Sequence, residues 1–352
     1  MRIGLPRETK PGERRVSLLP PAVAALVRGG HRIEVESGAG AGIGADNEAY
    51  AQAGAQIVSA AEAWGADLVV KVKEIQDADW AFVPDGSCIF CFHHLAGEPA
   101  RTHALAARHV TAIAFEMLRD AVGGFPLLAP MSEIAGRLAV EAGARLLGRL
   151  PGSVLVLGAG HAGLAAARTA ASMGCKVVIL TRSTNSRAAA TAAGFAARLA
   201  DPAEIEREAL RADLVVGAVF VPAQPTPKLL PRALVARMRR GAVIADISID
   251  AGGVAETSRP TTHAEPAFVE EGVVHYCVTN IPAAAPLQAA AALSAALLPY
   301  VDLIAWKGLA RALRDDPALR GAALLWRGRV NDAGIAAEAR LPYTPISATD
   351  LE

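Results

Sequence analysis

The segment Val154–Gly163, with the sequence Val-Leu-Val-Leu-Gly-Ala-Gly-His-Ala-Gly, constrains the fold of this chain more than any other. Apolar β-forming residues run into Gly-x-Gly-x-x-Gly, and an alanine-rich run of helical character follows. In such a unit Gly158 permits the tight bend, Gly160 lets the backbone approach a pyrophosphate, and Gly163 allows close contact between helix and strand. The segment therefore predicts a dinucleotide-binding fold.

The start of the following helix is expected to complete the phosphate site. Backbone N–H groups near Ala162 would bind phosphate oxygens with help from the helix dipole. We interpret His161 as a helix-start residue that touches phosphate. Val219, after a later strand, is also assigned to the cofactor site.

The end of the next strand bears on which dinucleotide binds. An acidic residue usually holds the ribose 2′-hydroxyl of NAD here, yet the chain has no Asp or Glu between Glu141 and Asp201. Arg182 offers a planar charged fork suited to a 2′-phosphate, and Ser183 and Arg187 lie beside it. This favours NADP(H), with NAD(H) as the alternative if the arginines are ordinary solvated loop residues.

Strand and helix patterns alternate along the 352 residues, which predicts two α/β domains. The first lobe has expected strands at Arg2–Leu5, Arg32–Glu36, Asp67–Val72, Cys88–Phe92 and Val110–Phe115. The second has them at Ser153–Leu157, Lys176–Leu180, Asp213–Ala218, Ala242–Ile247 and His275–Val278. We expect two Rossmann-like lobes with a cleft between them, each a mostly parallel sheet flanked by helices. Residues 1–130 plus about 286–352 would form a discontinuous substrate domain, and 131–285 the dinucleotide domain.

Helical patterns lie between these strands. In the first lobe they cover Pro20–Arg28, Glu48–Ala53 and Pro99–Arg108. A helix over Ser132–Leu147, with Ser132 as its cap, is expected to lead into the second lobe. Beyond Ala284 the chain is expected to be helical through Leu313, and again over Ala318–Trp326.

Charge and composition argue against several classes of protein. The 35 basic and 35 acidic residues balance, so nothing indicates a nucleic acid or an anionic membrane as a partner. The sequence has no uncharged apolar run of about 18 residues, which a membrane span would need, and no signal peptide is recognised before the first strand. We therefore expect a cytoplasmic protein. Cys88 and Cys91 would point to opposite faces of one strand, so no metal site is predicted.

Polar residues cluster where strands of the first lobe end. The segments concerned are Glu13–Val16, Lys71–Glu74, Phe92–Leu95 and Ala129–Arg137. Lys73 and His94 come just past strand ends, where ligands bind in parallel α/β sheets. In the second lobe, Asp246 and Asp250 end a strand before a glycine turn.

These segments resemble the alanine dehydrogenase and transhydrogenase α-subunit family, in order over nearly the whole chain. The matching segments are Gly4–Lys10, Glu13–Val16, Val70–Glu74, His94–Ala96, Pro126–Glu133, Ala135–Arg137, Gly158–Gly163, Val221–Pro222, Pro227–Leu229, Asp246–Gly253, Ser258–Thr262 and Asn280–Pro282. So long a series of motifs is far more specific than the glycine turn alone.

The resemblance implies a substrate site for a 2-oxo acid. Arg15 and Lys73 would bind its carboxylate and carbonyl, His94 would act as general acid/base, and Asp250 would steer the water and ammonia chemistry. The chemistry agrees, because a carboxylate needs a fixed cation and imine reduction needs proton delivery near neutral pH. Alternatives are a surface pair for Arg14 and Arg15, a merely solvated lysine at position 71 or 73, and a turn-capping role for Asp246.

Further substrate-site residues come from the same resemblance. Glu74 would orient Lys73, Met131 and Ser132 would line the cleft, and Asn280 is assigned to substrate binding.

The chain departs from the family at three places. The segment Leu150–Ser153 enters the nucleotide strand without the longer glycine-rich insertion of family members, so a homo-oligomer is expected with a dimer favoured over a hexamer. His93 replaces an apolar residue and could pack away from the pocket or add a polar group near it. The third departure is the missing ribose acid.

Because NADP pools are usually kept reduced, the expected reaction is a reduction. We expect an NADPH-dependent enzyme that reduces the imine formed from a 2-oxo acid and an amine or ammonia, giving an amino acid or an N-carboxyalkyl amino acid. The alternatives are an NAD(P)-dependent alanine dehydrogenase catalysing oxidative deamination, and a transhydrogenase-type or non-catalytic nucleotide-binding subunit.

Overall fold

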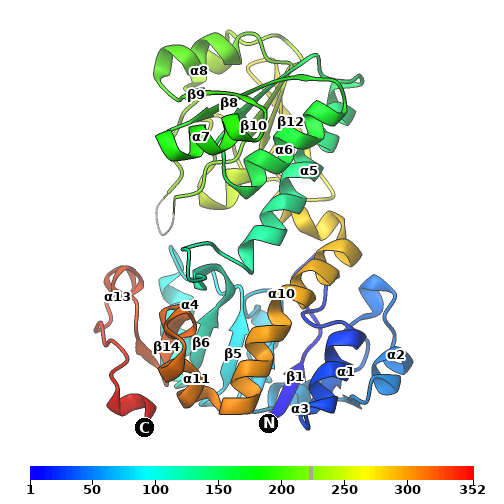
Figure 1. Ribbon diagram of the computed structural model, residues 1–352, viewed down its shortest axis with the longest axis vertical. Helices are drawn as coiled ribbons and strands as arrows, with labels where there is room; N and C mark the ends of the chain where they lie inside the picture. The colour runs from blue at the N-terminus through cyan, green and yellow to red at the C-terminus, as the bar shows by residue number, and fades with distance from the viewer. Residues whose placement is uncertain (222–224) are drawn as a thin grey trace. The chain divides into compact units, whose positions relative to one another are not determined.

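The computed structural model describes residues 1–221 and 225–352, whose contacts divide the chain into two units (Figure 1). Unit 1 joins Met1–Leu128 to Ala285–Glu352, and unit 2 is Ala129–Ala284. Each unit is built on its own mostly parallel sheet flanked by helices, so the expected α/β class with two Rossmann-like lobes is confirmed.

Unit 1 contains an eight-stranded sheet in the order β15-β14-β6-β5-β4-β1-β2-β3. Its strands are β1 (Arg2–Leu5), β2 (Arg32–Glu36), β3 (Gln56–Val58), β4 (Leu68–Val70), β5 (Cys88–Cys91), β6 (Thr111–Ala114), β14 (Ala323–Trp326) and β15 (Arg329–Val330). The first six are parallel, and β14 and β15 add an antiparallel edge. The order of the parallel strands reverses between β1 and β4. Ligands bind at such a switch point in open α/β sheets.

The strands of unit 1 form because their apolar runs are buried on both faces, as is usual in parallel sheets. Residues of β4 and β5 are at most 6% exposed. Trp64, Leu105 and Ile335 cover one face, each from a different helix. The helices of unit 1 are α1 (Pro20–Arg28), α2 (Asn47–Gln52), α3 (Ala60–Trp64), α4 (Pro99–Ala107), α10 (Pro286–Lys307), α11 (Leu309–Asp315), α12 (Pro317–Ala322) and α13 (Ala333–Ala339).

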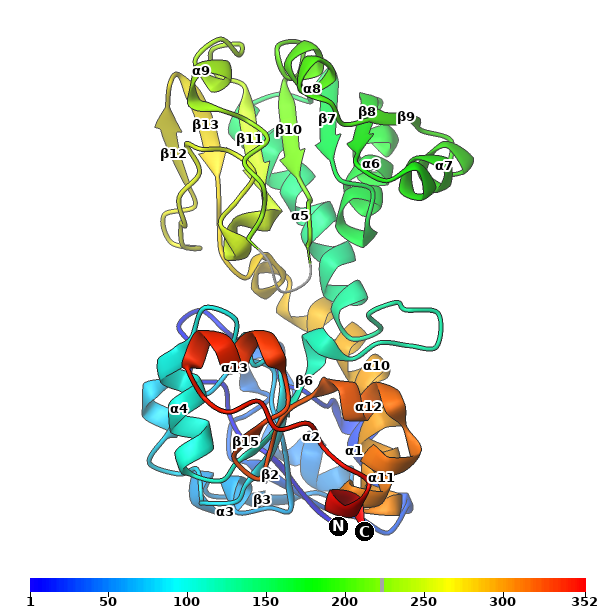
Figure 2. The same ribbon diagram turned by 90° about the vertical axis from the view of Figure 1, so that its left-hand side faces the viewer.

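Unit 2 contains a seven-stranded sheet in the order β12-β13-β11-β10-β7-β8-β9, which Figure 2 shows strand by strand. Its strands are β7 (Ser153–Leu157), β8 (Lys176–Thr181), β9 (Ala196–Leu199), β10 (Leu214–Gly217), β11 (Val243–Asp246), β12 (Ala267–Glu270) and β13 (Val273–Tyr276). All are parallel except β12. The strand order reverses between β7 and β10, so this sheet has the same winding as the parallel part of the sheet in unit 1.

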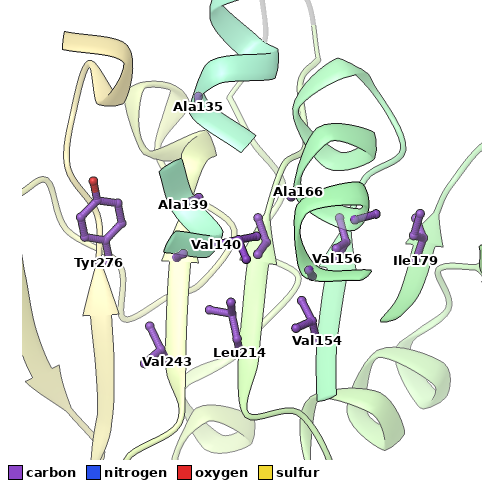
Figure 3. Close-up of a cluster of buried hydrophobic side chains, with 14 of the residues drawn as sticks. Ala135, Ala139, Val140, Val154, Val156, Ala166, Ile179, Leu214, Val243 and Tyr276 are labelled. Carbon is purple, nitrogen blue, oxygen red and sulfur yellow. The ribbon is translucent and has the colours of Figure 1, made fainter. Parts of the chain in front are cut away.

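Two helices cover one face of the sheet in unit 2, α5 (Leu128–Leu147) and α6 (His161–Ser172). Ala139 and Ala166 from these helices pack with Val154, Val156 and Leu214 of the sheet (Figure 3). The opposite face is covered by α8 (Pro202–Ala209) and α9 (Arg232–Val235). Small residues on α5 and α6 let both helices lie close to the strands, and this fixes the start of α6 beside the end of β7.

Two expectations about secondary structure are wrong. Ala318–Trp326 is not one helix, because α12 ends at Ala322 and Ala323–Trp326 pairs antiparallel with β6 as a fully buried strand. Ser132 does not cap α5, which begins at Leu128. Pro130 falls in the first turn of this helix, where its missing N–H needs no partner.

Among the described residues, α10 alone meets the length and composition expected of a membrane-spanning helix. Within its most apolar window, 44% of the residues are buried inside the structure. The core helices of soluble proteins meet the same criterion, so α10 is weak evidence for a membrane span.

Candidate active site

The predicted substrate residues of unit 1 follow the ends of neighbouring strands at its switch point. Glu8 follows β1, Lys71 and Lys73 follow β4, and His94 follows β5. Because β1, β4 and β5 are adjacent and parallel, their carboxyl ends meet at one edge of the sheet.

Arg15 is buried, with only 2% of its surface exposed, whereas Arg14 is exposed. The Nε and Nη2 groups of Arg15 donate to the two carboxylate oxygens of Glu13 at 2.7 and 2.5 Å. This two-point contact fixes the plane of the guanidinium group. The alternative of a surface pair for Arg14 and Arg15 is therefore wrong.

Lys71 and Lys73 are both buried, at 0% and 7% exposure. The ammonium of Lys71 lies 2.7 Å from the Asp79 carboxylate and 3.7 Å from that of Glu8. Burial alone would lower the pKa of Lys71, but these two carboxylates raise it above its usual value. The alternative that one lysine is merely solvated is wrong. Lys71 neutralises buried carboxylates, and the Lys73 ammonium lies 5.8 Å from the centre of the Phe92 ring.

Glu74 is also buried, and its Oε1 accepts a hydrogen bond from Lys10 Nζ at 2.6 Å. Burial would raise the pKa of Glu74, but the ammonium groups of Lys73 and Lys10 lower it to about 2. The carboxylate is therefore charged at neutral pH. Its role in orienting Lys73 stays a prediction.

His94 is exposed, and its ring stacks on Phe92 with 5.7 Å between centroids. Its backbone has φ 46°, in the left-handed region that non-glycine residues rarely adopt. Desolvation of the ring by the surrounding protein lowers the pKa of His94, and the positive charge of the Lys73 ammonium lowers it further. A neutral imidazole at working pH can accept a proton from a substrate.

His93 lies inside the fold, completely buried, with Nε2 3.1 Å from the carbonyl oxygen of Ile89. Burial lowers the pKa of His93 to about 4, so its ring is neutral at pH 7.

The glycine turn of unit 2 has the geometry that a pyrophosphate site needs. Gly158 has φ 108°, and a Cβ there would lie 2.2 Å from the Ala218 carbonyl oxygen. A Cβ at Gly163 would lie 2.0 Å from the Gly158 oxygen, whereas one at Gly160 would meet open space. Gly158 and Gly163 are therefore required by packing, and the open surface at Gly160 fits a phosphate group. His161 and Ala162 begin α6 here, and His161 Nδ1 lies 3.4 Å from Glu133.

The expected ribose site lies at the start of α7 (Thr184–Ala192). The hydroxyl of Ser183 accepts a hydrogen bond from the Ser186 N–H and caps this helix. Arg182 and Arg187 are exposed, and the described part of the chain shows no ion pair for either. Two unneutralised guanidinium groups beside a helix N-terminus fit a bound anion.

The two aspartates after β11 lie in different environments. Asp246 is fully buried and accepts hydrogen bonds from the Ser248 N–H, the Val254 N–H and the Ser258 hydroxyl, so its interpretation as a turn-capping residue is confirmed. Asp250, in the 3-10 helix η4 (Ile247–Ala251), is exposed. Only Asp250 is therefore accessible to a substrate.

The remaining predicted residues lie in unit 2. Met131 is buried and Ser132 half-buried on α5, and Asn280 has φ 56° while its carbonyl oxygen lies 3.2 Å from His263 Nε2. Val219 is half-buried after β10. Part of the family-like segment at Val221–Pro222 falls outside the described residues.

Sequence reasoning missed several residues that hold these groups in place. Glu8, Glu116, Lys228 and Ser248 all contact the loops that carry predicted site residues. Glu8, Lys228 and Ser248 lie within the family-like motifs. No motif indicates Glu116, because the N–H groups that it binds, those of His94 and His93, are 22 and 23 residues away along the chain.

Comparison with known proteins agrees with both units. The family model "Alanine dehydrogenase/PNT, N-terminal domain" matches residues 4–135, and "Alanine dehydrogenase/PNT, C-terminal domain" matches 131–333. The chain belongs to the alanine dehydrogenase/PNT family. This confirms the expected family and makes the protein an enzyme of the amino-acid dehydrogenase class.

Individual members of the family are similar over nearly their whole length. An alanine dehydrogenase of Mycobacterium tuberculosis is 41% identical, and alanine dehydrogenase 2 of Staphylococcus aureus is 37% identical, each comparison covering 98% of both chains. A solved L-alanine dehydrogenase superposes with a TM-score of 0.90 at 39% identity, over 96% of this chain and 99% of the other. A transhydrogenase from Sinorhizobium meliloti shares the fold, with a TM-score of 0.83 at 22% identity over 95% and 99%. The alanine dehydrogenases among them favour the alanine dehydrogenase alternative over imine reduction to an N-carboxyalkyl amino acid.

Proposed function

We propose that this enzyme interconverts L-alanine with pyruvate and ammonia. The observation that carries the proposal is the group of Arg15, Lys73 and His94 in unit 1, where two buried cations accompany an exposed imidazole near the strand switch point. Relatives about 40% identical over their full length are named alanine dehydrogenases, which supports this substrate.

The chemistry of these side chains suits a 2-oxo acid. The fixed guanidinium of Arg15 would bind the carboxylate, and the ammonium of Lys73 would polarise the carbonyl oxygen. Ammonia attack and water loss give an imine, and both steps move a proton at the substrate oxygen or nitrogen, a task for the His94 imidazole. Asp250 would stabilise the positive charge of the iminium. A bound nicotinamide cofactor supplies or accepts the hydride.

We propose NADP(H) as the preferred cofactor. Arg182 and Arg187 are exposed cations beside the Ser183 helix cap, in a stretch without acidic residues. A 2′-phosphate would neutralise this charge, whereas a ribose 2′-hydroxyl leaves it without a partner. NAD(H) remains the alternative, and steady-state kinetics with both cofactors distinguishes the two.

The test of the reaction is a panel of 2-oxo acids and amines followed by NADPH absorbance. The proposal expects turnover with pyruvate that requires ammonia, and the reverse reaction with L-alanine. Turnover that requires an amino-acid amine in place of ammonia would overturn it and support the N-carboxyalkyl product. His94→Ala should abolish turnover while the affinity for NADPH stays unchanged.

We also propose that the enzyme is a cytoplasmic homo-oligomer, with a dimer favoured over a hexamer. Only five residues separate the end of α5 at Leu147 from the start of β7 at Ser153, which supports the absence of an assembly insertion. Light scattering of the purified protein checks the mass, and a hexamer would overturn the dimer.

A further inference from the structure

Two carboxylates, the buried one of Glu8 and the half-buried one of Glu116, contact the chain immediately beside the predicted catalytic residues. Glu8 accepts hydrogen bonds from the N–H groups of Val72 and Lys73, at 2.5 Å on Oε1 and 3.2 Å on Oε2. Glu116 accepts from the N–H groups of His94 and His93, at 2.7 Å on Oε1 and 3.3 Å on Oε2. Each carboxylate therefore binds two consecutive N–H groups with its two oxygens.

Two consecutive N–H groups on one carboxylate show that the backbone is not extended at these residues. In an extended strand, successive N–H groups point to opposite sides, so one carboxylate cannot bind two in a row. The ladder between β4 and β5 still holds at Lys71 and Phe92, whose N–H groups donate to Phe90 and Val72. The residues after Lys71 and Phe92 turn out of the sheet, and the left-handed φ of His94 is part of this turn.

The two carboxylates come from opposite sides of the β4–β5 strand pair. Glu8 follows β1, the outer neighbour of β4, and Glu116 lies in the 3-10 helix η3 (Phe115–Met117) after β6, the outer neighbour of β5. Beyond the ends of β1 and β6, the carboxylates of Glu8 and Glu116 accept hydrogen bonds from backbone N–H groups in place of strand carbonyl oxygens. A carboxyl group has two oxygens side by side, so one side chain can bind two consecutive N–H groups, which suits a backbone conformation that is costly for a non-glycine residue.

The surrounding charges keep Glu8 in place. Its side chain is 2% exposed, and the Lys71 ammonium that pairs with Asp79 also lies 3.7 Å from it. Lys71 thus secures the carboxylate that holds the backbone of Lys73.

We propose that Glu8 and Glu116 are positioning residues for catalysis, each holding the backbone from which one catalytic side chain projects: Glu8 for Lys73 and Glu116 for His94. This inference rests on the roles proposed above for these two side chains. It predicts separable effects, because Lys73 binds the substrate carbonyl while His94 moves the proton.

The test uses Glu8→Gln and Glu116→Gln in the full-length enzyme. Glutamine keeps the shape but puts an NH₂ donor against one of the two backbone N–H groups. Asp67→Asn is the matched control, since Asp67 accepts the Arg2 N–H at 2.8 Å at the other end of β1. Hydrogen exchange measured by mass spectrometry should speed up over residues 71–74 in the first variant and 92–95 in the second, and at neither place in the control.

Kinetics should then separate the two positions. Misplacing a catalytic group by about 1 Å can cost about 100-fold in rate, so Glu116→Gln should lower kcat roughly 10- to 100-fold with little change in the KM for pyruvate. Glu8→Gln should chiefly raise that KM. The Kd for NADPH should not change, and Glu8→Asp and Glu116→Asp, which keep both carboxyl oxygens, should recover part of the loss.

Faster exchange with unchanged kinetics would overturn the proposal, and so would an equal loss of melting temperature, cofactor affinity and kcat in both variants. If the wild-type enzyme reduces another 2-oxo acid but not pyruvate, the alanine assignment fails. The split between KM and kcat, measured on that acid, still decides the roles of Glu8 and Glu116.

Discussion

The hydroxyl of Ser248 bonds both backbone groups of Val219, accepting from its N–H and donating to its carbonyl oxygen at 2.9 Å each. The loop after β10 is thereby tied to η4 after β11. Val219 lies beside the switch point of unit 2 and Asp250 lies in η4, so one side chain links the expected cofactor site to a predicted catalytic residue.

Removing this hydroxyl should weaken cofactor binding. Ser248→Ala loses two hydrogen bonds of about 1 kcal/mol each, and if half of that acts on the bound state, the Kd for NADPH rises about 5-fold. Fluorescence titration with NADPH measures it. Ser172→Ala, which removes an exposed hydroxyl at the end of α6, should leave the Kd unchanged. Equal affinities in both variants would show that the tie is not needed for binding.

The cofactor preference should depend on Arg182. A charge-assisted contact with a 2′-phosphate contributes about 1.5–3 kcal/mol, so Arg182→Ala should lower kcat/KM for NADPH at least 10-fold. The value for NADH should change little. Arg168→Ala, at an exposed position on α6, is the control. A parallel loss with both cofactors would contradict a 2′-phosphate contact.

Two glycines of the same turn should respond differently to alanine. Gly163→Ala places a Cβ 2.0 Å from the Gly158 carbonyl oxygen, so it should destabilise unit 2 and lower the melting temperature. Gly160→Ala meets open space in the structure and should leave the melting temperature nearly unchanged, while it obstructs the pyrophosphate and weakens NADPH binding. Similar melting temperatures for the two variants would contradict this assignment.

The buried ring of His93 should make unit 1 sensitive to acid. Its pKa falls from 6.5 to about 4 on folding, so the unfolded chain binds the proton more readily. Stability should therefore decline as the pH drops from about 6.5 to about 4, by about 3 kcal/mol in total. Below pH 4 this contribution is constant.

Tryptophan fluorescence can follow this effect, because all four tryptophans, Trp64, Trp80, Trp306 and Trp326, belong to unit 1. Urea unfolding at pH 7.5 and pH 5 should show a smaller difference in His93→Gln than in the wild type. His103→Gln, at an exposed position on α4, should behave as the wild type. An unchanged pH dependence in His93→Gln would sink the prediction.

The central strands could be predicted because apolar runs bounded by turns leave few alternatives. The bounds expected for β1, β2 and β7 agree with the structure. The edge strand β9 was missed, because its residues are mostly exposed and its pattern is that of a loop. The sequence pattern of Ala318–Trp326 suits a helix or a strand equally well, and only pairing with β6 makes Ala323–Trp326 a strand.

The candidate site shows the same division. Lys73 and His94 could be placed at strand ends from the sequence, because parallel strands leave polar residues there. The burial of Lys71 could not be predicted from the sequence, because Glu8 is distant along the chain and only folding brings its carboxylate near Lys71. Contacts from Glu116 to the backbone likewise depend on which strands are neighbours.

The antiparallel edge of unit 1 has a consequence for synthesis on the ribosome. β14 and β15 lie more than 200 residues after β6, so this lobe emerges first yet is completed last. Until they arrive, β6 exposes the unpaired N–H and C=O groups of an edge strand, which can pair with another chain. Unit 2 emerges in one piece between the two parts, so the nascent chain holds all of unit 2 while unit 1 still waits for the carboxyl-terminal strands.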